Sequence, residues 1–245
     1  MSAPQPELLR SLGRLVRGLS ALFWGLPLAL IVCVGTASAG WFKAYGLVPI
    51  LSVTGLLLFG LFQLGAFQKQ ERPWRTTLER AQLLALVNFG LSPFLFWWNH
   101  LPQNVFFSAV VCILGFSALL FLFTLNLVLL RLGAMLPDEA LRLEIRHYTS
   151  LNRNLLIALM TIIATYLVLT RIIIHFFPQI PHLPEHLDIF SLQIAIPALG
   201  LQISSAWLIW LMTCLLVLLP LSMTMALLWK TKEVILENVF GGKGN

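Results

Sequence analysis

Six long apolar runs, joined by segments that alternate between rich and poor in Lys and Arg, constrain this chain more than any other feature. A bilayer hydrocarbon core about 30 Å thick requires about 20 apolar residues of α-helix, at about 1.5 Å of rise per residue. Runs of that length lie at 19–40, 45–67, 81–98, 105–131, 154–177 and 204–229. We therefore predict an all-α, polytopic membrane helix bundle, with six transmembrane helices arranged as three hairpins.

The composition supports lipid as the solvent for most of the chain. Hydrophobic residues make up 58% of the sequence and charged residues only 11%, whereas about 25% of the residues in a soluble domain are charged. The six runs leave little chain for a separate soluble domain. The expected partner of the folded chain is the lipid bilayer.

The distribution of cations predicts the orientation. Of the sixteen Lys and Arg residues, all but Lys43 and Arg171 lie in the N-terminal segment, the loops 68–80 and 131–153, or the tail 230–245. Cations collect on the cytoplasmic side of short loops. We predict that both termini are cytoplasmic, in a bacterial inner membrane. Because this topology accounts for the net charge of +6, no nucleic-acid partner is expected.

The segment 178–203 is predicted to be a structured outer loop. Its part 188–203 is apolar but short for a seventh span, and it contains Gln193, Pro197 and Gln202, which favours an interfacial or re-entrant segment. At the other end, the residues Ala37-Ser38-Ala39 are typical of a signal-peptide cleavage site. The preceding apolar run is long for a signal peptide, so we favour an uncleaved anchor.

Residues 1–18 have the pattern of an amphipathic interfacial helix. On a helical wheel Arg10, Arg14 and Arg17 fall within about 60° of one another, and the leucines at positions 8, 9, 12, 15 and 19 occupy the opposite arc. We predict that the apolar side lies in lipid and that the arginines face anionic head groups. The helix either anchors the first span or forms a docking collar for a cytoplasmic partner.

The loops 68–80 and 131–153 are predicted to contain short helices. In the first, Pro73 suits a helix start and Arg75 stands four residues before Glu79. In the second, Pro137-Asp138-Glu139 reads as a helix start, and Asp138 is spaced to pair with Arg142. Both loops are either solvated turns between spans or contact surfaces for protein partners at the cytoplasmic face.

Prolines and tryptophans mark particular points of the spans. Pro27, Pro93 and Pro220 lie inside predicted spans and are expected to kink or locally open them. Trp74 and Trp229 fall near the predicted inner boundary, where the indole ring is expected to lie at the level of the head groups.

The fifth span carries a polar stripe. Five polar residues share an arc of about 120°, namely Asn154, Thr161, Thr165, Arg171 and His175. Such a stripe should face protein or water. We predict that Arg171 pairs with Glu185 or Asp188, the acids of the following outer loop, and so holds that loop over the bundle. The alternative is that the stripe contacts a substrate or an ion.

Histidines on the outer side raise the question of a metal. The sequence His182-Leu-Pro-Glu185-His186 has the spelling H-x-x-E-H, but Pro184 interrupts the continuous helix that the zinc-protease site requires. A loose metal site would use His175, His182, His186 and Asp188, and a haem clamp would use His100 and His175. We predict neither a cofactor nor catalytic residues.

Other catalytic signals are missing from the sequence, so an enzyme is not expected. It contains no G-x-S-x-G, H-E-x-x-H or G-x-x-x-x-G-K-[ST] motif. The six spans contain no carboxylate, which argues against a carrier coupled to protons or sodium. Asn88 and Asn126 are expected to tie neighbouring helices together by hydrogen bonds.

Three function classes remain open. We favour a non-catalytic membrane subunit of a larger complex. The layout also resembles the six-span permease halves of ABC-2-type exporters, which likewise have an amphipathic N-terminal helix, a helical first cytoplasmic loop and a structured segment between spans five and six. That resemblance implies transport by a dimer working with a separate ATPase. The third class is a membrane redox subunit that binds haem or metal at the outer side.

Overall fold

The structure, a computed structural model, describes residues 6–39, 45–65, 67, 71–101, 103–135, 139–176, 193–196 and 201–240. Within these ranges, side chains at several positions, including 169–176 and 201–215, lie outside the description. The chain divides into two compact units, and each is described here by itself. Unit 1 comprises residues 1–153 and 221–245, and unit 2 comprises residues 154–220.

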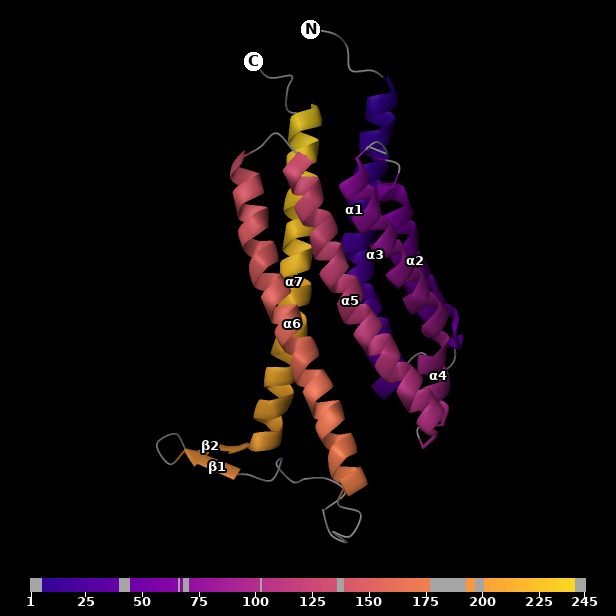
Figure 1. Cartoon of the computed structure of the whole chain (residues 1–245), viewed down its shortest axis with the longest axis vertical. Helices are drawn as coiled ribbons and strands as arrows, with labels where there is room; N and C mark the ends of the chain where they lie inside the picture. Colours follow the sequence, from indigo (N-terminus) through magenta and orange to yellow (C-terminus); the bar gives the residue numbers. More distant parts are fainter. Residues whose placement is uncertain are drawn as a thin grey trace. The chain divides into compact units, whose positions relative to one another are not determined.

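Unit 1 is built from helices that lie along one another (Figure 1). Its elements are α1 (Pro6–Val34), a π-helical turn η1 (Gly35–Ala39), α2 (Val48–Leu64), α3 (Arg72–Leu91), α4 (Pro93–His100), α5 (Val105–Met135), the first part of α6 (Glu139–Phe176) and the last part of α7 (Ser205–Phe240). Helix α1 packs on α2, α2 on α3, and α3 on α5.

Several of these helices are suited to a membrane. Three stretches of the described chain are long and apolar enough to cross one, namely Arg10–Ala37, Arg72–His100 and Val105–Met135, and α2 is a shorter apolar helix. Many large apolar side chains are exposed on these helices, among them Ile31, Phe59 and Ile113. Exposure on this scale would be unfavourable in water but suits contact with lipid. The prediction of a helical protein with several apolar membrane helices is confirmed to this extent.

Helices α1 and α2 approach each other closely at two glycines. A Cβ atom on Gly18 would lie 2.7 Å from the carbonyl oxygen of Gly60, closer than any side chain allows. Around this crossing Leu15, Leu19 and Leu61 are fully buried. In a membrane, where lipid tails are as apolar as leucine, such close backbone approach stabilises a helix pair through van der Waals contact.

The N-terminal segment differs from the prediction of a separate interfacial helix over residues 1–18. Helix α1 runs without a break from Pro6 to Val34. Its arginines Arg10, Arg14 and Arg17 are exposed, as expected, but Leu15 and Leu19 on the other side pack in the protein core. The apolar face is therefore covered by protein at these positions, because α2 lies against it. Residues 6–18 are thus the first turns of a longer helix.

Pro93 separates α3 from α4, as predicted. Proline has no N–H group, so the carbonyl of Phe89, four residues earlier, loses its helical partner. The hydroxyl of Ser92 donates to that carbonyl at 2.9 Å. This bond satisfies the freed oxygen inside a part of the chain where no water is expected. The helices at Pro27 and Pro220 run on without interruption.

Helices begin at the predicted places in the segments 68–80 and 131–153. Helix α3 begins at Arg72, and its Arg75 pairs with Glu79 at 2.7 Å. Helix α6 begins at Glu139. Both helices continue into the following apolar run, so the expected short loop helices are the first turns of long helices. Trp74 also differs from expectation, because it is 1% exposed and packs in the protein core.

Unit 2 contains the rest of α6, two short strands and the first part of α7. Strand β1 (Gln193–Ile196) pairs antiparallel with β2 (Leu201–Ser204), with Gln193 opposite Ser204 and Ile196 opposite Leu201. The segment 178–203, predicted to be a structured outer loop, includes β1 and most of β2, while residues 178–192 and 197–200 lie outside the described residues. Helix α7 then begins at Ser205.

Candidate functional site

The first polar feature of unit 1 is a buried cluster of three side chains from three helices. Asn126 of α5, Asn152 of α6 and Thr224 of α7 are at most 1% exposed. The amide of Asn152 donates to Asn126 Oδ1 at 3.0 Å and to Thr224 Oγ1 at 2.9 Å. The amide of Asn126 also donates to Thr224 Oγ1, at 3.2 Å. We call these three residues the polar cluster.

The polar cluster is suited to holding helices together. It contains no charged group, and its amide groups donate to oxygens of neighbouring helices, apart from the bond of Asn126 to Leu122 O of its own helix at 2.8 Å. The expectation that Asn126 ties helices is confirmed. Neither Asn152 nor Thr224 stands out in the sequence, because Asn152 stands beside Arg153 in a charged stretch and Thr224 is one threonine in an apolar run. The spacing of buried α6 residues, Ile145, Thr149 and Asn152, was the available signal.

The second feature is an apolar cavity of about 360 Å³ in unit 1, which we call the apolar cavity. It is lined by residues from α1, η1, α2, α3, α4, α5 and α7, most of them aliphatic. Two of the lining residues, Val34 of α1 and Gly115 of α5, are also exposed on the surface of the protein. The cavity is therefore open on the side of α1 and α5.

Three polar side chains line the apolar cavity, and they differ in their hydrogen bonding. The hydroxyl of Thr54 donates to Ile50 O at 2.8 Å, and that of Ser92 donates to Phe89 O. The two hydroxyl oxygens lie 3.5 Å apart. The third side chain, Asn88, is 9% exposed, and its buried Oδ1 has no hydrogen-bond partner among the described residues. Asn88 was expected to tie helices like Asn126, but the structure gives this oxygen no such bond.

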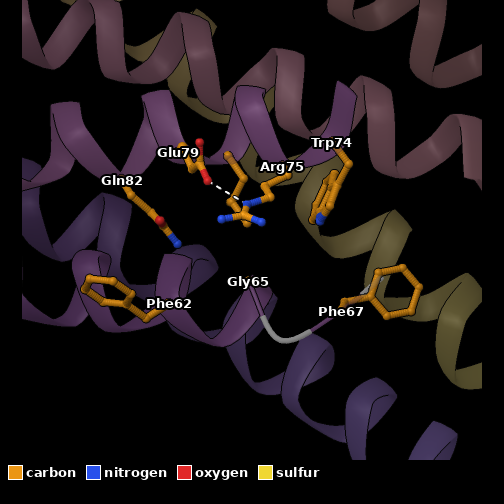
Figure 2. Close-up of a pocket in the computed structure, with 8 residues that line it drawn as sticks. Phe62, Gly65, Phe67, Trp74, Arg75, Glu79 and Gln82 are labelled. Carbon is orange, nitrogen blue, oxygen red and sulfur yellow. Dashed lines mark hydrogen bonds and ion pairs between the residues drawn. The ribbon is translucent and has the colours of Figure 1, made fainter. Parts of the chain in front are cut away.

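The third feature is a pocket of about 360 Å³ between the end of α2 and the start of α3 (Figure 2). Figure 2 shows the ion pair of Arg75 and Glu79 on one side of it, with Phe62 and Phe67 on the other. The indole N–H of Trp74 is buried here and has no partner in the part of the chain that the structure describes. Because the two charges pair with each other, the pocket has no excess of either sign.

Of the fifth-span residues proposed from the sequence, the structure describes part. Thr161 and Thr165 are exposed, and the hydroxyl of Thr161 donates to Ile157 O of its own helix at 2.8 Å. Arg171 and His175 belong to α6, but their side chains lie outside the description. Glu185 and Asp188 are outside the described residues altogether. The pairing of Arg171 with an outer acid remains a prediction.

The histidine hypotheses fall largely outside the described residues as well. This holds for His182 and His186 and for the side chain of His175. His100, at the end of α4, is exposed, and its Nδ1 lies 3.0 Å from Phe96 O. Among the side chains that are described, no group of three His, Cys, Asp or Glu residues is placed to hold a metal ion.

No protein-family model matches the chain, and neither a curated protein nor a solved structure matches it.

Proposed function

We propose that the chain is a six-span inner-membrane protein that acts as a non-catalytic subunit of a larger membrane complex, with both termini in the cytoplasm. Beyond the three apolar stretches already described, α6 and α7 have 38 and 36 residues. At about 1.5 Å per residue each is more than 50 Å long, well above a 30 Å hydrocarbon core. Helix α2, with 17 residues, is at the short end of the range for a span.

The observation that carries the proposal is the exposed face at the start of α6. Leu143 is 69% exposed, Leu151 is 45% exposed and His147 between them is also exposed. The three residues stand four apart and so share one side of the helix. Arg142 and Arg146, on the adjoining turns, are exposed too. We call these five residues the α6 face.

The composition of the α6 face suits neither plain solvent nor the interior of a bilayer. Two arginines and a histidine would be costly in hydrocarbon, while two leucines exposed together on a helix in water mark an interaction site. A protein surface that combines an apolar groove with acidic residues matches both kinds of side chain. The buried face of the same helix, with Ile145 and Asn152, is already used for packing within unit 1.

The test is site-specific photocrosslinking in native membranes. A photoreactive amino acid at position 143 is expected to form a discrete adduct with one protein partner. Arg146→Glu, in the same photoreactive chain, is expected to reduce that adduct at least about fivefold, because the charge facing an acidic partner is reversed. A photoreactive residue in place of Ile113, which is 56% exposed on the apolar helix α5, is the matched control and should label lipid.

The proposal is wrong if position 143 labels only lipid, as position 113 does, or if the adduct is unchanged by Arg146→Glu. The six-span topology is tested separately, by reporter tags at the two ends. Tags at both ends accessible only from the cytoplasm support an even number of crossings, and opposite accessibility contradicts it.

A further inference from the structure

We infer that the apolar cavity is a binding site for a lipid-soluble molecule with an apolar body and one hydroxyl group, and that Asn88 is the residue that recognises the hydroxyl. The inference goes beyond the proposed subunit role and does not depend on it. It rests on three observations in unit 1, namely the unpartnered amide oxygen, the size and lining of the cavity, and its opening between α1 and α5.

The unpartnered oxygen is the first step. Asn88 Oδ1 is buried and receives no hydrogen bond, and Asn88 lies on α3 within a stretch long and apolar enough to cross a membrane. A buried acceptor without a partner is unfavourable, and lipid offers no water to replace the missing donor. A leucine of similar shape at this position would carry no such penalty. The site is therefore expected to receive a donor from outside the chain.

The lining of the cavity indicates what kind of donor fits. The hydroxyl hydrogens of Thr54 and Ser92 are used on carbonyls of their own helices, at 2.8 and 2.9 Å. Ser92 directly follows the last residue of α3 and stands one turn after Asn88, so the two residues are on the same side of the chain. The remaining lining is dominated by aliphatic side chains such as Leu30, Leu57 and Leu114. This pattern of one recognition point in an apolar surround is typical of a small-molecule site, and it does not suit an ion or a charged head group.

The volume sets the size of the molecule. The cavity measures about 360 Å³, and an engineered apolar cavity of about 150 Å³ holds benzene. Scaling by volume gives room for about fourteen non-hydrogen atoms. The openings at Val34 and Gly115 lie on apolar helices, so the molecule would enter from the bilayer. A hydroxyl is the group that suits an amide best, because it donates to the oxygen and can accept from the nitrogen.

The experiment uses the full-length protein in lipid nanodiscs and a matched pair of competitors. The probe is 1-decanol carrying a diazirine near the chain end, and the labelled peptides are mapped by mass spectrometry. The competitors are 1-decanol and methyl nonyl ether, which have the same number of non-hydrogen atoms and one oxygen each, but only the alcohol can donate. The probe is expected to label cavity-lining peptides of α1 and α5. The concentration of 1-decanol that halves this labelling is expected to be about tenfold lower than the concentration of the ether that does so.

Two variants test the assignment of the site. Asn88→Leu removes the acceptor. The concentrations of 1-decanol and of the ether that displace the probe are then expected to be nearly equal, and the unfolding temperature is not expected to fall. Gly115 lines the cavity, and a Cβ on it meets no atom within 4 Å. Gly115→Phe is therefore expected to fill the cavity and to abolish the labelling. Gly90→Phe is its control, since Gly90 is also exposed and free of neighbours within 4 Å but does not line the cavity.

The inference is overturned by any of three results. The first is labelling spread evenly over the exposed helix faces, and the second is equal displacement by alcohol and ether in the unmodified protein. The third is labelling of cavity peptides that survives Gly115→Phe. If Asn88→Leu fails to fold, the comparison of Gly115→Phe with Gly90→Phe still decides whether the cavity is occupied.

Discussion

Replacing Asn152 by leucine is expected to destabilise unit 1 by about 2–4 kcal/mol. Leucine has the same branching and the same number of side-chain heavy atoms, so the change removes polarity more than shape. The substitution removes the bonds from Asn152 to Asn126 at 3.0 Å and to Thr224 at 2.9 Å. Hydrogen bonds between membrane helices contribute about 0.6 kcal/mol each on average, so two contribute about 1.2 kcal/mol.

The larger part of the expected loss of stability comes from Asn126 Oδ1, which loses its hydrogen-bond donor. Asn126 Oδ1 is buried and receives its hydrogen bond from Asn152. Without that donor it becomes an unsatisfied acceptor, which costs about 1–3 kcal/mol. Thr224 Oγ1 still receives the bond from the Asn126 amide at 3.2 Å, so only one oxygen is orphaned. The sum of both contributions gives the stated range.

The measurement is the free energy of unfolding in mixed micelles, from a titration with a denaturing detergent. The matched control is Thr161→Val on the same helix, because Thr161 is exposed and its hydroxyl donates to Ile157 O in its own helix. This control should change stability by less than about 0.5 kcal/mol. The double variant Asn126→Leu with Asn152→Leu should lose less than the sum of the two single variants, since no acceptor of this pair is then orphaned.

Two results would refute this reasoning. One is a loss for Asn152→Leu that is no larger than the loss for Thr161→Val. The other is strict additivity in the double variant, which would mean that the two asparagines do not act on each other.

Three further predictions concern packing and surface charge, with unfolding free energy as the common measurement. Gly18→Ala should destabilise by more than about 1 kcal/mol, because the added Cβ would lie 2.7 Å from the Gly60 backbone oxygen. Gly13→Ala is the control and should stabilise by up to about 1 kcal/mol through helix propensity, because its Cβ would meet no atom within 4 Å. Equal effects of the two variants would contradict the close crossing of α1 and α2. Gly133→Ala should cost less than Gly18→Ala, since the nearest atom, at 2.6 Å, is the terminal Cδ1 of the Ile145 side chain and not a backbone atom, and the reverse order would contradict this reasoning. Arg75→Ala should change stability by no more than about 0.5 kcal/mol, because its ion pair is largely exposed, and a larger loss would assign the pair a structural role.

Local features of the fold could be predicted because their causes lie within a few residues of one another. The apolar runs predict helices of membrane length, and the structure has three such stretches. Helix starts at Arg72 and Glu139 and the break at Pro93 follow from proline chemistry and helix-start residues close by in the chain. The continuity of α1 was missed, because the amphipathic pattern of its first turns is equally compatible with lipid or with another helix as the apolar surface.

The roles of individual polar residues were decided by tertiary structure. Asn88 and Asn126 look alike in the sequence, each a single asparagine in an apolar run, yet Asn126 meets two partners while Asn88 Oδ1 lies at a cavity with none. Which neighbour a side chain meets depends on how each helix is rotated and where it crosses the next. That rotation is set by contacts far apart in the chain, such as Gly18 against Gly60. The sequence by itself therefore determined which segments become helices suited to lipid, and the packing of those helices decided which of their polar atoms are satisfied.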